Sequence, residues 1–260
     1  MISNRQESTH CVIIPSYNSG PLLLETVESV LRFSRPVIVV IDGSTDGSAL
    51  PLEALSRRVP ELHILGLAKN QGKGAAVLCA LDFALQKGWS HAVVFDSDGQ
   101  HEAADIPRFI AASQLHPDAM VLGVPIFGPD APAIRVAGRV IGNWWTNLET
   151  LWGGIKDSLF GFRVYPVAVA VKILHGMKMG RRFDFDTQLA VRLYWEGVRP
   201  LNLPTRVRYR TKESGGVSHF RYVRDNLLLT FAHASLLVTA FTKLPRMLQS
   251  YRQTPLRLPE

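Results

Sequence analysis

The sequence contains only two cysteines among its 260 residues, Cys11 and Cys79. Each lies in an apolar run, which is the usual environment of a small buried thiol. Two isolated cysteines cannot form the disulfide network of a small secreted protein or a cysteine-based metal site. The fold therefore depends on a hydrophobic core, which a chain of this length with 47% hydrophobic residues can build.

Long apolar runs are also missing from the first 225 residues, so we expect no membrane-spanning segment there. The opening stretch, MISNRQESTH, is polar and lacks the apolar centre of a signal peptide, which leads us to expect a cytoplasmic protein. No internal repeat or low-complexity linker divides the chain. We therefore expect one α/β domain with an appended C-terminal segment.

Acidic residues are scarce at the end of the chain. The net charge is +7, and from Arg199 onward eleven Lys and Arg residues stand against three acids. Such a segment suits nucleic acid, a phosphorylated ligand or an anionic membrane surface. The basic residues are not interleaved with aromatic residues in a recognisable nucleic-acid-binding module, so we expect no nucleic-acid partner.

Short apolar runs alternate with amphipathic helical patterns through the first half of the chain. Strands that are apolar throughout and alternate with helices are typical of a mainly parallel sheet with helices on both faces. We expect strands at 11–15, 36–42, 62–66, 91–96 and 119–123, and helices at 21–33, 50–59, 73–87 and 106–114.

The pattern is less regular after residue 123. The next ten residues are rich in Pro and Gly and predict a loop. Beyond it we expect a helix at 134–151, a turn and strand within 153–166, a helix at 186–195 and an extended segment at 199–210.

The stretch 226–242 contains no Lys, Arg, Asp or Glu, although basic residues flank it. Its length is close to the minimum that could cross a bilayer. We expect a helix that lies at the membrane interface, with its apolar side in lipid and its basic ends on anionic headgroups. A helix packed on the domain is the main alternative, and a spanning helix ranks third.

Polar residues follow each of the first four predicted strands. In a parallel sheet these positions share the edge where ligands bind. Asp42 could accept hydrogen bonds from a base or ribose, and Lys73 at a helix start could face a diphosphate. Taken singly, each loop could equally be a turn or a helix cap.

Two acids separated by one residue, Asp96 and Asp98, follow the fourth predicted strand. On an extended stretch they point to the same side and can share Mg²⁺ or Mn²⁺, and Gln100 can add a neutral oxygen. Such an ion usually takes one or two protein carboxylates and completes its shell with water and phosphate oxygens. The alternative is a turn at Asp98 and a helix cap at Asp96.

Seven motifs, in this order, resemble the family-2 glycosyltransferases with the GT-A nucleotide-diphospho-sugar transferase fold. The motifs are PSYN, VVIDGSTDGS, NQGKGAA, DSDGQH, GFRVYP, FDFDTQ and RYRTKESGGVSHFR. The dolichyl-phosphate mannose and glucose synthases are the most similar branch. The resemblance implies an α/β GT-A domain at 1–225, followed by the apolar helix and basic tail at 226–260.

The resemblance also implies roles for individual residues. The expected donor contacts are Pro15, Tyr17, Asp42, Lys73 and Asp96. The expected metal ligands are Asp96, Asp98 and Gln100, and Asp98 is counted as catalytic for that reason.

The chain departs from the family pattern at three positions. Ser19 stands where Glu is frequent after PxYN, and Ile41 stands where a second acid often precedes Asp42. His219 stands where a lysine often follows the serine of the last motif. These departures leave the nucleotide base and an acceptor contact at His219 open.

The acceptor decides whether the reaction needs a base. A hydroxyl must lose a proton, whereas a lipid phosphate is already anionic and needs cationic positioning. Asp186 matches the catalytic base of many relatives, although it could simply be an acid at a helix start. The expected acceptor or diphosphate contacts are Arg135, Arg139, Arg163, Arg210, Ser218 and His219.

We therefore predict an inverting, metal-dependent glycosyltransferase that moves a hexose from a UDP- or GDP-sugar to a lipid-linked acceptor at the inner face of the cytoplasmic membrane. Polyprenyl phosphate is the first candidate acceptor, and a lipid hydroxyl with Asp186 as base is the second. A sugar-1-phosphate nucleotidyltransferase and a non-catalytic, nucleotide-binding membrane module are the rivals. The role of His101 stays open.

Overall fold

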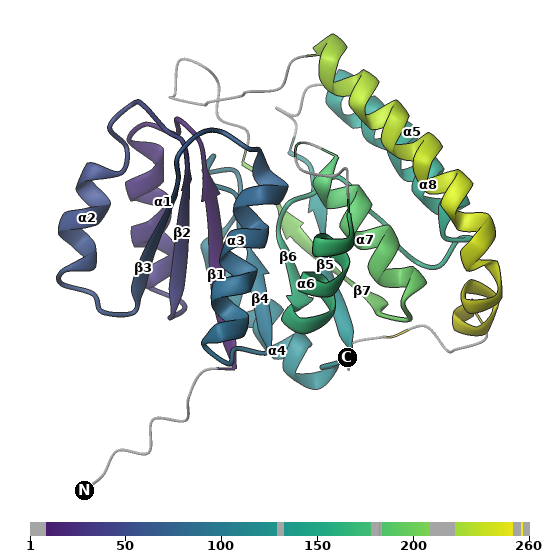
Figure 1. Ribbon diagram of the computed structural model, residues 1–260, viewed down its shortest axis with the longest axis horizontal. Coiled ribbons are helices and arrows are strands. Elements are labelled where there is room, and N and C mark those ends of the chain that lie inside the picture. Colours follow the sequence, from purple (N-terminus) through teal and green to yellow (C-terminus); the bar gives the residue numbers. More distant parts are fainter. Residues whose placement is uncertain are drawn as a thin grey trace, which may run out of the picture.

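A seven-stranded sheet forms the centre of the protein (Figure 1). The computed structural model describes residues 9–128, 133–177, 182, 184–208, 222–251 and 256. The strands lie in the order β3-β2-β1-β4-β6-β5-β7. Their bounds are β1 His10–Ser16, β2 Val37–Asp42, β3 Leu62–Leu67, β4 His91–Val94, β5 Ala119–Ile126, β6 Arg163–Pro166 and β7 Arg199–Arg206.

Most of the strand pairs are parallel, as the sequence predicts. β1 pairs in parallel with β2 and β4, β2 with β3, and β5 with β7. β6 runs antiparallel to both of its neighbours, β4 and β5. Because of this reversal Arg163, the first residue of β6, pairs with Val94, the last residue of β4. The chain before β6 is thereby brought to the edge where β4 ends.

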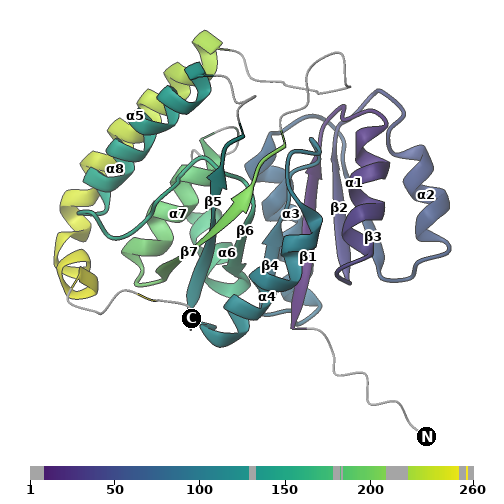
Figure 2. The same ribbon diagram turned by 180° about the vertical axis from the view of Figure 1, so that it is seen from behind.

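Helices cover both faces of the sheet (Figures 1 and 2). Along β1, Cys11 and Ile13 belong to an apolar cluster with residues of α3, α6 and α7, while Val12 and Ile14 belong to a second cluster with residues of α1, α2 and α4. This alternation with apolar residues on both sides is the burial pattern of a strand covered on both faces. The helices are α1 Leu22–Leu31, α2 Leu50–Ser56, α3 Lys73–Gln86, α4 Ile106–Leu115, α5 Ala133–Glu149, α6 Val167–Gly176, α7 Phe185–Trp195 and α8 Tyr222–Tyr251, with a short 3-10 helix at Ala103–Asp105.

Three details differ from the sequence-based expectation. β5 continues to Ile126, so the expected loop begins later, because β7 pairs with β5 along that whole length. β4 ends at Val94, although the N–H of Phe95 still bonds to the carbonyl of Ile13, 2.9 Å away. Helix α6 was not predicted, although its buried residues, Val167, Ala170, Val171 and Leu174, follow the i, i+3, i+4, i+7 spacing of a helix.

Helices α5 and α8 lie side by side at one end of the sheet (Figures 1 and 2). Leu236 of α8 is buried in the core, and the buried carboxylate of Glu149 in α5 lies 2.7 Å from Nδ1 of His233 in α8. Seven apolar side chains on the two helices face away from the core and are 51% to 79% exposed: Val140, Ile141, Trp144, Phe231, Val238, Phe241 and Leu248. We call these seven residues the apolar outer face.

Helix α8 thus packs on the domain along one side, as one alternative expected. Its other side is apolar and exposed, which is the arrangement that an interfacial helix needs. Among the described residues, no helix is both long enough and apolar enough to cross a membrane.

Candidate active site

The loops after the first four strands meet at one edge of the sheet and bond to one another. The side chain of Asn18 accepts the N–H of Thr45 at 2.8 Å, and Asp46 accepts the N–H of Gly20 at 2.8 Å. These bonds join the loop after β1 to the loop after β2. The prediction of a shared polar edge is therefore confirmed.

Asp42 at the end of β2 organises the loop that precedes α3. Its two carboxylate oxygens accept the N–H groups of Gln71 and Gly72, each at 2.8 Å. Gly72 has a φ of 97°, a conformation that side-chain-bearing residues rarely adopt, and it leads directly into α3. Asp42 is almost fully buried, so its observed role is to hold the backbone that presents Lys73.

The loop after β1 joins the DSDGQH loop through three buried serines. The hydroxyl of Ser19 lies 2.9 Å from that of Ser16 and 2.8 Å from that of Ser97, the residue between the two acids. The serine that replaces the family's frequent Glu therefore connects two loops of the site. Pro15 lies inside β1 and is buried, whereas Tyr17 is partly exposed in the loop that follows.

A lysine and two acids form the charged centre of the site. The ammonium nitrogen of Lys73 lies 2.7 Å from Oδ1 of Asp96 and 2.7 Å from Oδ2 of Asp186. The second oxygen of Asp96, Oδ2, lies 3.2 Å from Nε2 of His101. The structure thus brings together Asp96 from the donor motif and Asp186 from the start of α7.

The electrostatics follow from these contacts. Burial by itself would lower the pKa of Lys73, but the charges of Asp186 and Asp96 outweigh it and raise the pKa. Burial likewise opposes ionisation of Asp96, yet Lys73 and then His101 hold the pKa of this acid far below its usual range. Asp96 is therefore an ionised carboxylate whose two oxygens both face cationic or N–H groups.

Asp98 is in a different environment. Burial, followed by the neighbouring charge of Asp96, raises the pKa of Asp98 above its usual value. Its Oδ1 accepts the N–H of Gln100 at 3.0 Å. A carboxylate with raised pKa beside another acid is one that a bound cation would stabilise in its ionised form.

These residues fit a hard divalent ion such as Mg²⁺ or Mn²⁺ through Asp98 and Gln100. In the part of the chain that the structure describes, no cluster of three or more His, Cys, Asp or Glu residues could hold a metal unaided. A site with few protein ligands is normal for an ion that also binds substrate phosphates. Asp96, the third expected ligand, is already engaged by Lys73 and His101.

The segment before β6 closes the site from the other side. A Cβ atom on Gly161 would lie 2.1 Å from Oδ2 of Asp96 and 2.6 Å from the ammonium of Lys73. Only glycine leaves room for this ion pair. Asp157, at the start of the segment, accepts the N–H groups of Leu159 and Phe160 and so fixes the turn.

The structure corrects the expected role of Arg163. Its side chain is fully buried, and its guanidinium donates to the carbonyl oxygens of Phe160 and Asp186, both at 2.6 Å. It also donates to the hydroxyl of Tyr165 at 3.2 Å. Because β6 is an inner strand, this arginine lies under the site rather than on its rim and does not face an incoming phosphate.

Arg139 is nearer to the surface, with 19% of its side chain exposed. One guanidinium nitrogen lies 2.7 Å and 2.9 Å from the two oxygens of Asp157. The backbone of Arg135 belongs to α5, but its side chain is outside the described residues. Arg210, Ser218 and His219 also lie outside them, so the expected phosphate cradle stays a prediction.

Three residues of the site were missed from the sequence. Gly161 gives no local signal, because its neighbours Lys73 and Asp96 are far away in the chain. The contact of His101 with Asp96 spans only five residues, but the ring packs against Phe160 and Phe162, which are distant in the sequence. Asp157 could have been found, since Asp before Ser in a turn often accepts backbone N–H groups two or three residues on.

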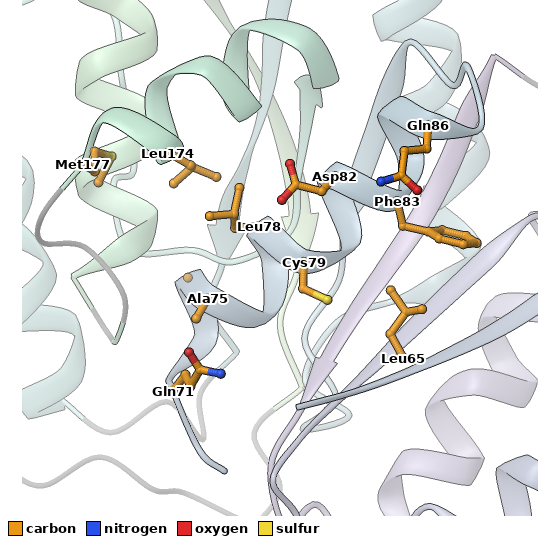
Figure 3. A pocket seen from close by; sticks show the side chains of 11 residues that line it. Leu65, Gln71, Ala75, Leu78, Cys79, Asp82, Phe83, Gln86, Leu174 and Met177 are labelled. Carbon is orange, nitrogen blue, oxygen red and sulfur yellow. The ribbon is translucent and has the colours of Figure 1, made fainter. Parts of the chain in front are cut away.

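An open groove of about 460 Å³ runs along the outer side of α3 (Figure 3). Its walls are mainly apolar and include Leu65, Leu78, Phe83, Leu174 and Met177. Gln71 lies at the end of the groove nearest the start of α3. The lining includes none of the strand-end acids, so the charged centre and this groove are separate features.

Comparisons with known proteins agree with this geometry. The model of glycosyl transferase family 2 matches residues 11–173, more than half of the chain. A polyprenol monophosphomannose synthase from Mycolicibacterium smegmatis is 27% identical over a 220-residue alignment that covers 78% of this chain and 78% of the relative. An undecaprenyl-phosphate mannosyltransferase from Micrococcus luteus is 26% identical over a 224-residue alignment that covers 79% of this chain and 87% of the relative.

A solved structure shares the fold. The glucosyl-3-phosphoglycerate synthase from Mycobacterium tuberculosis, in complex with Mn²⁺, UDP-glucose and phosphoglyceric acid, superposes with a TM-score of 0.63 at 15% identity, covering 90% of this chain and 80% of that one. The α/β fold with its mostly parallel sheet is the GT-A fold of the glycosyltransferases. The chain belongs to glycosyl transferase family 2.

Proposed function

We propose that this glycosyltransferase is an inverting, divalent-metal-dependent enzyme that transfers a hexose from a nucleoside diphosphate sugar to polyprenyl phosphate. The two relatives described above are named for products or acceptors of that kind. The structural neighbour was solved with Mn²⁺ and UDP-glucose. The choice between a UDP- and a GDP-sugar is left to experiment.

The donor would lie at the carboxyl edge of the sheet, where the loops after β1, β2 and β4 meet. A metal held by Asp98 and Gln100 would supply neutralisation of the leaving diphosphate. Tyr17 is partly exposed at the same edge. The acceptor would attack the anomeric carbon from the side opposite the diphosphate, and a single displacement of this kind inverts the sugar.

The choice of a phosphate as the acceptor depends on the environment of Asp186. One oxygen, Oδ2, is bound to Lys73, and among the described residues the other, Oδ1, is buried without a hydrogen-bond partner. Only 8% of this side chain is exposed. A general base must come within hydrogen-bond reach of the hydroxyl it deprotonates. A carboxylate enclosed in this way therefore favours an acceptor that is already anionic, such as a lipid phosphate.

The direct test is a donor and acceptor panel. Purified protein is incubated with Mn²⁺ or Mg²⁺, with UDP- or GDP-hexoses, and with a polyprenyl phosphate, the matching polyprenol or a membrane lipid extract. Products are identified by mass. We expect a hexosyl phosphate adduct only with the phosphorylated lipid. If no donor is turned over with any metal and any of these lipids, the proposed function is wrong.

The alternative acceptor, a lipid hydroxyl, makes Asp186 the catalytic base. Replacing Asp186 by Asn separates the two cases, because the amide cannot accept a proton but keeps the shape. With a phosphate acceptor we expect turnover within about tenfold of wild type, since only support for Lys73 is weakened. A fall of about 10²-fold or more with donor binding intact would favour the hydroxyl.

We also propose that the protein acts at the inner face of the cytoplasmic membrane. The apolar outer face of α5 and α8 includes Trp144, a residue type enriched at membrane interfaces. Basic residues flank the apolar stretch of α8 in the sequence, which suits anionic headgroups. A lipid-linked acceptor would be met in the plane of such a surface.

A further inference from the structure

His101 is enclosed by aromatic side chains. Only 3% of its side chain is exposed. Its ring centroid lies 4.6 Å from that of Phe160, 5.3 Å from that of Phe95 and 5.7 Å from that of Phe162. These rings cover most of the imidazole, and the small part that stays exposed lines a pocket beside α1.

The polar contact of this imidazole is with Asp96. Nε2 of His101 lies 3.2 Å from Oδ2 of Asp96. An ionised carboxylate can only accept hydrogen bonds, so Nε2 carries the proton. Nδ1 is buried and, among the described residues, has no hydrogen-bond partner. The ring is therefore aimed at one acceptor, the acid of the donor motif.

Asp96 is held from the opposite side as well. Its Oδ1 lies 2.7 Å from the ammonium of Lys73. The backbone of His101 is fixed in turn, since it forms a β-bridge with Val207, and the neighbouring carbonyl of Gln100 accepts the N–H of Arg208 at 3.0 Å. The carboxylate has little freedom to rotate when both oxygens are bound to anchored groups.

We propose that His101 is a positioning residue that fixes the Asp96 carboxylate for the nucleotide sugar, with Lys73 holding its other oxygen. His101 acts through Asp96 and does not touch the donor. This inference rests on the proposed function in one respect, namely that Asp96 lies in the donor site.

Two substitutions separate the hydrogen bond from the aromatic packing. His101→Phe keeps a ring among Phe95, Phe160 and Phe162 but cannot donate to Asp96. His101→Gln loses the ring, while its side-chain amide nitrogen can replace Nε2 as donor. Binding of UDP and of GDP, each with Mn²⁺, is measured by calorimetry for both variants and wild type, alongside urea unfolding.

We expect His101→Phe to weaken the binding of the preferred nucleotide by about tenfold or more, the usual effect of removing a partner that orients a ligand-binding group. His101→Gln should restore affinity to within a few-fold of wild type, although it should be the less stable variant. The proposal is overturned if His101→Phe binds the nucleotide as well as wild type, or if His101→Gln binds it no better than His101→Phe. It is also overturned if the affinities of the variants follow their stabilities.

An NMR measurement tests the contact between His101 and Asp96 independently of enzyme activity. The Nε2 proton of a buried, hydrogen-bonded imidazole exchanges slowly and should give a low-field NMR signal that is absent from His101→Phe. Asp96→Asn should shift this signal, and its insensitivity to that change would overturn the contact. If wild type binds neither nucleotide while the signal behaves as expected, the proposed function fails and the positioning of Asp96 by His101 stands.

Discussion

Arg163 donates a hydrogen bond to the main-chain carbonyl of Asp186, with 2.6 Å between Nη1 and the oxygen. This bond joins the start of β6 to the start of α7. It fixes the backbone of the residue whose carboxylate anchors Lys73. A buried arginine thus supports the charged centre from below.

Replacing Arg163 by Met should lower the free energy of unfolding by about 2–4 kcal/mol, because several buried carbonyls lose a charged donor. Urea unfolding measures this, with Arg206→Met at the exposed last residue of β7 as the control. A variant of unchanged stability that binds substrate phosphate poorly would instead restore Arg163 to the phosphate site.

Replacing Gly161 by Ala should impair nucleotide binding. The added Cβ would lie 2.1 Å from Oδ2 of Asp96 and 2.6 Å from the ammonium of Lys73, so the anchored Asp96 carboxylate has to leave its position. We expect Mn²⁺-dependent nucleotide binding to fall by about tenfold or more, and the free energy of unfolding to fall by about 1–3 kcal/mol. Gly176→Ala, where nothing lies within 4 Å of the new atom, is the matched control. Equal effects of the two changes would contradict this account.

Replacing Asp98 by Asn should remove the metal dependence of nucleotide binding. The amide is neutral and a poorer ligand for a hard ion, so we expect Mn²⁺-dependent affinity to fall by about 10²-fold. Calorimetric titration with and without Mn²⁺ gives the comparison. Without metal, the variant should be at least as stable as wild type, because burial and the neighbouring Asp96 disfavour the ionised form of Asp98. If nucleotide binding by the variant still depends on Mn²⁺, Asp98 is not a metal ligand.

His10 should make the protein sensitive to mild acid. Burial, with the nearby charge of His91 as the second cause, lowers the pKa of His10 to about 4. The folded state therefore resists protonation, so this stability is present above pH 6.5 and is lost as the pH falls through about 4. Between pH 7.5 and 5 we expect a loss of about 2 kcal/mol. His10→Gln should show a shallower dependence in urea unfolding, and an unchanged slope would reject the assignment.

The apolar outer face should bind membranes. The double variant Val238→Glu and Phe241→Glu places charge where lipid would lie. Each substitution removes roughly 1.5–3 kcal/mol of favourable free energy for moving an apolar side chain out of water. Co-sedimentation with vesicles containing anionic lipid should fall by about tenfold or more. Leu50→Glu with Ala54→Glu on α2 makes the same charge change at the other end of the sheet (Figure 1). If both double variants lose binding equally, general charge and not this face is responsible.

Local patterns in the sequence were enough to predict the alternating elements, the mainly parallel sheet, the polar edge and the family. Each of these depends on residues close together in the chain, such as the apolar run before Asp96. The period of a strand or helix and the residue that ends it are local properties. The family motifs are short and local in the same way.

The contacts within the site were decided only by the tertiary structure. Lys73 and Asp186 lie 113 residues apart, and they meet because β6 runs against its neighbours and returns the chain to the edge of β4. The same reversal buries Arg163, which the sequence predicted to face a phosphate. Spacing within one segment carries no information on which distant segment lies beside it. Strand order and direction decide which charges become partners.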